Sequence, residues 1–271
     1  MRQGKKVSAR RKGLTVAFVL LFIFSSGMLI HDFVRSGRER AANEALVQRV
    51  EQAVSLGEGT SETIYDDSVS AEAPTPERDY QPLVQENSHL AAWLMIEGTE
   101  VNYPVMYTPD SPEYYLRKAF DGSYALSGSL FVGADCVPDG TNIIIYGHNM
   151  KDGSMFGSLD SYANEDYAKE HQEIIYDLIQ PDGSYKRLAF YSRIYSVDEK
   201  NVFRYYYSTD LSDPDAFQYY IEEVMSASLY DLGVTAKCGD RLLTLSTCSY
   251  HTEDGRFVVV AREKHSSTST R

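Results

Sequence analysis

The stretch that decides the fold is Leu243-Thr244-Leu245-Ser246-Thr247-Cys248, which is followed, after a polar turn at residues 250–255, by Arg256-Phe257-Val258-Val259-Val260. Both runs are apolar and have the length of a β-strand. Because two strands joined by so short a turn pair antiparallel, we expect position 256 to lie near position 248. A strand that ends in Ser-Thr-Cys delivers its thiol to the rim of a sheet, with a guanidinium beside it.

Similar short apolar runs recur along the chain, and Gly, Asp and Pro separate them. The predicted strands are residues 93–96, 101–107, 128–132, 142–147, 173–178, 187–197, 241–247 and 256–261. Eight short strands with this punctuation predict a closed or nearly closed β-barrel. Residues 181–184, Pro-Asp-Gly-Ser, have the composition of a hairpin turn. The predicted fold is therefore mainly β.

Two helices are predicted within the same region. Residues 83–94 form a plausible short helix, and residues 213–230 form a long one just before the cysteine strand. Asp213 or Ser212 can cap the long helix, and Pro214 suits its first turn. Its apolar stripe consists of Phe217, Tyr220, Ile221, Val224, Met225 and Leu229.

Charge is distributed unevenly along the 271 residues. Six of the 26 basic residues lie in residues 1–13, which contain no acid, so the remainder carries 20 basic against 39 acidic residues. So acidic a body repels polyanions. Nucleic acid is excluded as a partner.

The basic residues 1–13 precede an apolar segment, residues 14–31, that predicts a single transmembrane anchor. Cations before the segment and acids after it predict a cytoplasmic N-terminus, with the rest of the chain outside the cell membrane. A cleaved signal peptide is the alternative, because the basic start and Ser25-Ser26-Gly27 are similar to one, but no clear cleavage site precedes His31-Asp32. Residues 32–79 predict a juxtamembrane helix and a flexible linker, residues 80–265 the catalytic domain, and residues 266–271 a polar tail.

Three cysteines are an odd number for an exported chain, which points to at least one unpaired thiol. Cys136 and Cys238 could pair with each other, and the sequence leaves this open. The interpretation we favour is that both are small buried apolar residues. Cys248 is then the thiol available for chemistry.

A third group closes another apolar run. Residues 143–147, Ile-Ile-Ile-Tyr-Gly, lead to His148, and a loop-like sequence comes after it. A cation beside a cysteine favours its thiolate, and a guanidinium can hydrogen-bond an oxyanion. Thiol, imidazole and guanidinium together are the groups needed to attack an amide carbonyl. Cys248, His148 and Arg256 are therefore the candidate catalytic residues.

Two of these residues have rivals. Arg262 lies at the far end of the strand from Arg256, roughly 20 Å away at about 3.3 Å per residue, so only Arg256 can serve the thiol. His251 lies three residues after Cys248, but within the polar turn. The remaining histidines are weaker candidates: His31, His89, His171 and His265.

Metal and cofactor sites are poorly supported. The chain has no Cys-x-x-Cys, no His-x-x-x-His, no Gly-rich phosphate loop and no dinucleotide fingerprint. We expect no metal and no cofactor.

The motif at residues 244–248, Thr-Leu-Ser-Thr-Cys, together with residues 146–149, Tyr-Gly-His-Asn, and Arg256 with its valine run, resembles the sortases, cysteine transpeptidases of Gram-positive cell surfaces. The resemblance covers residues 91–263. Three features are similar to class B: residues 149–159 with Gly-Ser-Met-Phe at 153–156, the long helix at residues 213–230, and an N-terminal anchor.

The resemblance implies an eight-stranded sortase barrel with N-terminal helices and no metal. It implies that Cys248 attacks the threonine carbonyl of a five-residue sorting signal near a surface protein's C-terminus. His148 as imidazolium would protonate the departing amine, and Arg256 would steady the oxyanion. An amine of a peptidoglycan precursor would then resolve the thioacyl enzyme. The resemblance also places four residues along the substrate groove: Leu116, Val202, Phe203 and Ser246.

One difference from the relatives bears on which sorting signal this chain recognises. Some relatives carry an asparagine in the loop where this chain has Ser111-Pro112-Glu113. The signal is therefore left open between the Asn-Pro-x-Thr-Asn type and the Ser/Asn-Pro-x-Thr-Gly type.

Three other functions compete with this one. An L,D-transpeptidase would need a Ser-His-Gly-Cys context, which is absent. An anchored adhesin or pilin-like subunit is expected to carry its own sorting signal, whereas residues 264–268 are polar. A pilus-polymerising sortase is the runner-up, because the sequence does not say whether the acceptor amine belongs to a wall precursor or to a pilin lysine.

Overall fold

The fold is seen in a computed structural model that describes residues 3–57, 78–197, 203–248 and 255–264. By its internal contacts the chain forms two units, Met1–Ala42 and Asn43–Arg271, and each is described by itself. Most of the predicted linker, Val202 and His251 lie outside the described residues.

The first unit is the greater part of one long helix, α1 (Gln3–Gly57). It runs without a break through both the predicted transmembrane segment and the predicted juxtamembrane helix. The reason is that no proline interrupts it, and isolated glycines such as Gly27 and Gly37 cost only about 1 kcal/mol each in a helix. Within the described part of the chain, residues 13–51 form the one helix whose length and apolar composition suffice to cross a membrane.

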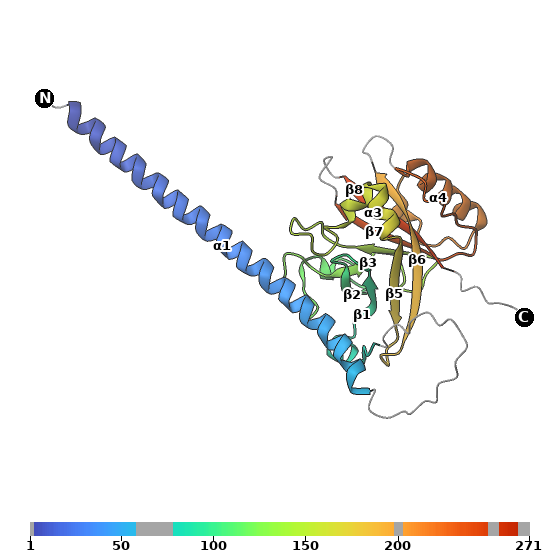
Figure 1. Ribbon diagram of the computed structural model, residues 1–271. Coiled ribbons are helices and arrows are strands. Elements are labelled where there is room, and N and C mark those ends of the chain that lie inside the picture. Colours follow the sequence, from blue (N-terminus) through green and yellow to red (C-terminus); the bar gives the residue numbers. More distant parts are fainter. Residues whose placement is uncertain (1–2, 58–77, 198–202, 249–254, 265–271) are drawn as a thin grey trace, which may run out of the picture. The chain divides into compact units, whose positions relative to one another are not determined.

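The second unit is built on an eight-stranded barrel (Figure 1). Each of the eight predicted apolar runs contributes one strand, and the predicted fold class is confirmed. The order around the barrel is β1-β2-β3-β4-β7-β8-β6-β5, and closure leaves no unpaired sheet edge. The strands are β1 (Leu90–Met95), β2 (Asn102–Met106), β3 (Leu130–Val132), β4 (Asn142–Tyr146), β5 (Glu173–Ile179), β6 (Tyr185–Val197), β7 (Leu242–Cys248) and β8 (Arg256–Glu263).

Two strand pairs are parallel, β2 with β3 and β4 with β7, and the remaining neighbours are antiparallel. The β4–β7 pair joins segments about a hundred residues apart, from Asn142 beside Leu242 to Tyr146 beside Ser246. The middle of these strands is fully buried: Ile143, Ile145, Leu243 and Leu245 are each 0% exposed. This rigid core holds the ends of both strands in place, and with them the residues just beyond those ends.

A second apolar cluster lies where the end of α1 meets the domain. Leu46 and Val50 are buried there together with Leu83 on α2 (Gln81–Glu86) and with Trp93 on β1. Burying side chains of this size contributes about 1.5–3 kcal/mol each. The last turns of α1 are therefore part of the second unit's core.

The predicted helix over residues 83–94 is wrong beyond Glu86, where α2 ends. Asn87 turns to an extended conformation, and its side-chain Nδ2 donates to the Tyr115 hydroxyl at 2.8 Å. Its Oδ1 accepts from the backbone N–H of His89 at 3.0 Å. Such local side-chain bonds compete with helical ones. Leu90 then begins β1 instead of a further helical turn.

The predicted long helix is α4 (Pro214–Ala227), and Asp213 is its N-cap. The Asp213 carboxylate accepts from the backbone N–H of Ala216 at 2.9 Å, as expected for a helix start. Phe217, Tyr220 and Val224 are buried, but Met225 and Leu229 of the predicted stripe are exposed. Shorter helices are η1 (Tyr114–Arg117), η2 (Leu159–Ala163), α3 (Glu165–Glu170) and η3 (Tyr205–Tyr207).

All three cysteines are free thiols. Cys136 is buried, as interpreted from the sequence, whereas Cys238 is exposed, so the burial expected for Cys238 is wrong. Cys238 lies in the turn before β7, outside the strands whose pairing buries the barrel core.

Candidate active site

Strands β4, β7 and β8 are consecutive neighbours in the barrel, and they bring the three candidate catalytic residues together. Cys248 is the last residue of β7, and Arg256 is its direct partner at the start of β8. Directly opposed residues on antiparallel strands have Cβ atoms about 4.5–5.5 Å apart and share a face of the sheet. The guanidinium therefore has the thiol within reach. Arg262, the rival, pairs with Leu242 at the opposite end.

His148 flanks the thiol on the other side. The parallel register sets Tyr146 beside Ser246, so His148 and Cys248 each lie two residues beyond a paired position. Gly147 holds this register past the strand end, because its N–H donates to the Ser246 carbonyl at 3.2 Å and its carbonyl accepts from Thr247 Oγ1 at 2.8 Å. Neighbouring strands lie about 4.8 Å apart. Cys248 thus sits between an imidazole and a guanidinium.

The imidazole of His148 is oriented by the backbone of η1. Its Nε2 lies 2.8 Å from the carbonyl oxygen of Leu116. A carbonyl only accepts, so Nε2 carries a hydrogen whether the ring is neutral or protonated. Nδ1 is then the nitrogen that gains and loses the proton.

Burial lowers the pKa of His148, and the charge of Arg117 lowers it further, while the bond to the Leu116 carbonyl partly opposes both. The ring is therefore neutral over a wider pH range than an exposed histidine. A neutral imidazole with Nδ1 unprotonated is able to accept a proton from a thiol.

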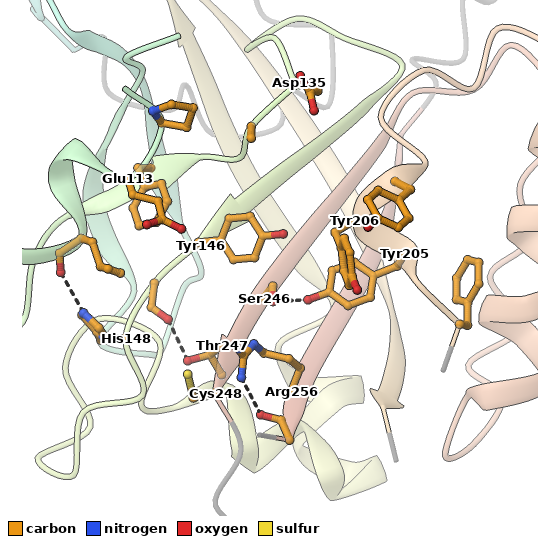
Figure 2. A pocket seen from close by; sticks show the side chains of 18 residues that line it. Glu113, Asp135, Tyr146, His148, Tyr205, Tyr206, Ser246, Thr247, Cys248 and Arg256 are labelled. Atoms are coloured by element: carbon orange, nitrogen blue, oxygen red, sulfur yellow. Dashed lines mark hydrogen bonds between the residues drawn. The ribbon is translucent and has the colours of Figure 1, made fainter. Parts of the chain in front are cut away.

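The three residues face one cavity of about 730 Å³ (Figure 2). Three of the four residues predicted to line a substrate groove, Leu116, Phe203 and Ser246, are in its wall. The fourth, Val202, lies outside the described residues. The structure places these side chains at the cavity, while their role in substrate binding stays a prediction. His89 and His171 do not line it, since His89 contacts Tyr115 and His171 contacts the Glu97 carbonyl.

Phenols form much of the remaining wall. The hydroxyl of Tyr205 lies 2.6 Å from Ser246 Oγ, and Tyr146 packs against Phe131 with ring centroids 5.8 Å apart. Burial raises the pKa of both Tyr146 and Tyr205, and the charge of Arg256 acts against that rise in each case. The guanidinium of Arg256 thus projects its charge into this cavity, where an oxyanion would need it.

Sequence reasoning missed a buried side chain that anchors the end of β7. The Nδ2 of Asn149 donates to the backbone carbonyl of Cys248 and to the carboxylate of Asp160, both at 2.8 Å. Asn149 is only 8% exposed. It links the histidine loop, the cysteine strand and η2. No local signal in the sequence marks its contact with a residue 99 positions away.

We expect Asn149→Ala to lower the free energy of unfolding by about 1–3 kcal/mol, because it removes two hydrogen bonds donated by a buried amide, each contributing about 0.5–1.5 kcal/mol. Urea unfolding followed by fluorescence measures the change. Gln218→Ala, which removes an exposed amide on α4, is the matched control and should stay within about 0.5 kcal/mol of the parent. Equal stability of the two variants would show that Asn149 anchors nothing.

Comparison with known proteins agrees with this geometry. Residues 94–264 match the Sortase domain family. Sortase B of Listeria monocytogenes serovar 1/2a is 30% identical over 256 residues, covering 92% of this chain and 94% of that protein. A solved Staphylococcus aureus sortase B–substrate complex is 25% identical, with a TM-score of 0.67, and the match covers 86% of this chain and 100% of that one. A Clostridium perfringens sortase B structure is 29% identical, with a TM-score of 0.61 and coverage of 68% and 98%.

The chain therefore belongs to the sortase family of cysteine transpeptidases. Its relatives by sequence and by structure are sortase B proteins, and it is a class B sortase.

Proposed function

We propose that this sortase cleaves a C-terminal sorting signal after its threonine and transfers the surface protein to an amine of a peptidoglycan precursor. The observation that carries the proposal is the convergence of Cys248, His148 and Arg256 at a cavity large enough for an extended peptide. The proposed catalytic residues are these three, and the groove wall includes Leu116, Phe203 and Ser246.

Acylation begins with proton transfer from the Cys248 thiol to Nδ1 of His148, whose Nε2 hydrogen is occupied by the Leu116 carbonyl. The sulfur attacks the threonine carbonyl, a C–S bond forms, and the carbonyl oxygen becomes an oxyanion. Arg256 supplies the positive charge and the fork of N–H donors that stabilise it. The scissile C–N bond then breaks, and the Nδ1 proton passes to the departing amine.

Deacylation reverses these transfers with a new amine. The acceptor nitrogen attacks the thioester and gives its proton to Nδ1 of His148. The C–S bond breaks, and the proton returns to the sulfur. One amide is exchanged for another through a thioester, so no nucleotide is consumed.

In a plot of kcat/KM against pH, we expect the midpoint of the acid limb to lie below about 6.5, the pKa of an exposed histidine. Protonated His148 cannot accept the thiol proton, so activity is lost as the pH falls through its pKa, which burial depresses. A pH profile with a quenched signal peptide measures the limb. Arg117→Ala removes a charge that also lowers this pKa, so the limb should move to higher pH. If the acid limb stays at the same pH in Arg117→Ala, a group other than His148 must be responsible for it.

The apolar helix within residues 13–51 is the proposed single-pass anchor in the cell membrane. Six cations precede the span, and the body beyond them is acidic, which supports a cytoplasmic N-terminus and an extracellular catalytic domain. Protease treatment of intact cells tests this orientation. The domain should be cleaved while an N-terminal epitope tag stays protected, and the opposite pattern would reverse the orientation.

A peptide-library cleavage assay read by mass spectrometry tests the activity as a whole. The library contains both Asn-Pro-x-Thr-Asn and Ser/Asn-Pro-x-Thr-Gly peptides, and the acceptors are a peptidoglycan stem-peptide amine and a lysine-containing peptide. Products joined at threonine to the stem-peptide amine support wall anchoring. Products joined to the lysine peptide alone would favour a pilus-polymerising enzyme, and uncleaved peptides would rule out both.

A further inference from the structure

A second, smaller cavity of about 200 Å³ adjoins the active-site cavity. Its walls are formed by residues 107–109 and Pro112, which come after β2, and by residues 132–137, at the end of β3 and beyond it. Pro112, Ala134 and Asp135 line both cavities, so the two share a boundary. Figure 2 shows Asp135 at the end of the larger cavity remote from Cys248. The smaller cavity is therefore a side pocket at the far end of the groove.

The register of the barrel gives the offset, measured along the strand direction, between the thiol and this pocket. The N–H of Gly133 donates to the carbonyl of Ile144 at 2.8 Å, and Ile144 pairs with Thr244. The turn that carries Asp135 thus begins at the level of Thr244, four positions before Cys248 on β7. At about 3.3 Å per residue, that separation is about 13 Å.

The acyl half of the substrate must lie along this path. It stays covalently attached to the sulfur while the amine leaves, so the groove has to hold it for the second half of the reaction. A five-residue signal cleaved after its fourth residue places four residues before the scissile bond. The residue preceding the signal is the fifth, and its Cα lies about 13 Å from that of the threonine in an extended chain. It therefore reaches the level of the side pocket along the groove.

Charge and backbone geometry single out Asp135 in this pocket. Among the described residues that line the side pocket, Asp135 carries the charge, and its side chain is exposed. Its φ is 61°, in the left-handed region that few non-glycine residues adopt. Tyr107 and Pro109 offer apolar walls for the stem of a long cationic side chain.

We propose that the side pocket binds the residue immediately preceding the sorting signal and that Asp135 selects a lysine or arginine there. This inference rests on the proposed sorting-signal cleavage. It means that the enzyme also recognises one residue outside the five-residue signal, through the loop between β3 and β4.

Three quenched peptides that differ only at that preceding residue, Lys, Ala or Glu, test the proposal with the full chain at low ionic strength. One exposed ion pair contributes about 0.2–1 kcal/mol, so kcat/KM should fall about 1.4- to five-fold from Lys to Ala and by a similar factor from Ala to Glu. At high salt the differences in kcat/KM among the three peptides should shrink, because dissolved ions screen exposed ion pairs.

Asp135→Asn removes the charge and keeps a residue type that tolerates the left-handed region. The preference for Lys should disappear in this variant. Asp139→Asn is the matched control, since Asp139 is an exposed acid on the same loop that lines neither cavity, and the preference should persist there. Cleavage of all three peptides at equal rates by the parent, or a preference unchanged in Asp135→Asn, would overturn this inference alone. Failure to cleave any of them would overturn the proposed function and the inference with it.

Discussion

Replacing Cys248 with alanine should abolish cleavage of a sorting-signal peptide, a loss of more than about 10³-fold in kcat/KM. Alanine offers no atom that can form the acyl-enzyme bond, and neither His148 nor Arg256 can replace it. Cys248 is exposed at the end of β7, so the substitution leaves the barrel core untouched. The unfolding midpoint of the variant should match that of the parent. A fluorogenic peptide assay and a thermal melt measure the two quantities.

Cys238→Ala is the matched control, since Cys238 is the other exposed thiol among the described residues. It should retain full turnover. Trapping with substrate and no acceptor should add the acyl mass to the parent and to Cys238→Ala, but not to Cys248→Ala. Turnover that survives the loss of Cys248 would place the nucleophile elsewhere.

Arg256→Lys should slow acylation by about 10²–10³-fold, the range seen when one oxyanion donor is removed. Lysine keeps the charge but replaces a planar fork of five N–H donors by a compact ammonium on a flexible stem. The loss should appear in kcat more than in KM, because the oxyanion exists only after attack. Single-turnover kinetics with the signal peptide separate the two.

Arg262→Lys makes the same chemical change at the other end of β8, beside Leu242 rather than Cys248. Its kcat should stay near that of the parent. If Arg256→Lys instead turned over at a near-normal rate, a different donor would have to hold the oxyanion, and the backbone amides after Cys248 would be the next to test.

The barrel could be predicted because its determinants are local. Each strand is a short apolar run between turn residues, and one tight connection was enough to set Arg256 against Cys248. Asp213 marked the start of α4 in the same way, by its position before a proline and an apolar stripe. The position of His148 at a strand end showed only that its side chain could reach a substrate. Its role as a proton carrier came from the resemblance to a known family.

Contacts between distant segments were beyond this reasoning. Nothing local indicates that β4 pairs in parallel with β7, because the partners are a hundred residues apart and parallel pairing carries no turn signature. The anchor formed by Asn149 and Asp160 and the side pocket beside Asp135 depend on that pairing and on the β3–β4 loop. The helix expected over residues 83–94 failed because Asn87 satisfies its own neighbours' backbone and ends α2 early.

The parallel β4–β7 pair also sets the stage of folding at which the thiol of Cys248 and the imidazole of His148 come together. The thiol and the imidazole belong to segments separated by most of the domain, and only completion of the closed sheet sets them side by side. In an extended chain, before the sheet closes, the Cys248 thiol has no imidazole beside it. We therefore expect a partly folded chain to react with a signal peptide more slowly than the folded domain.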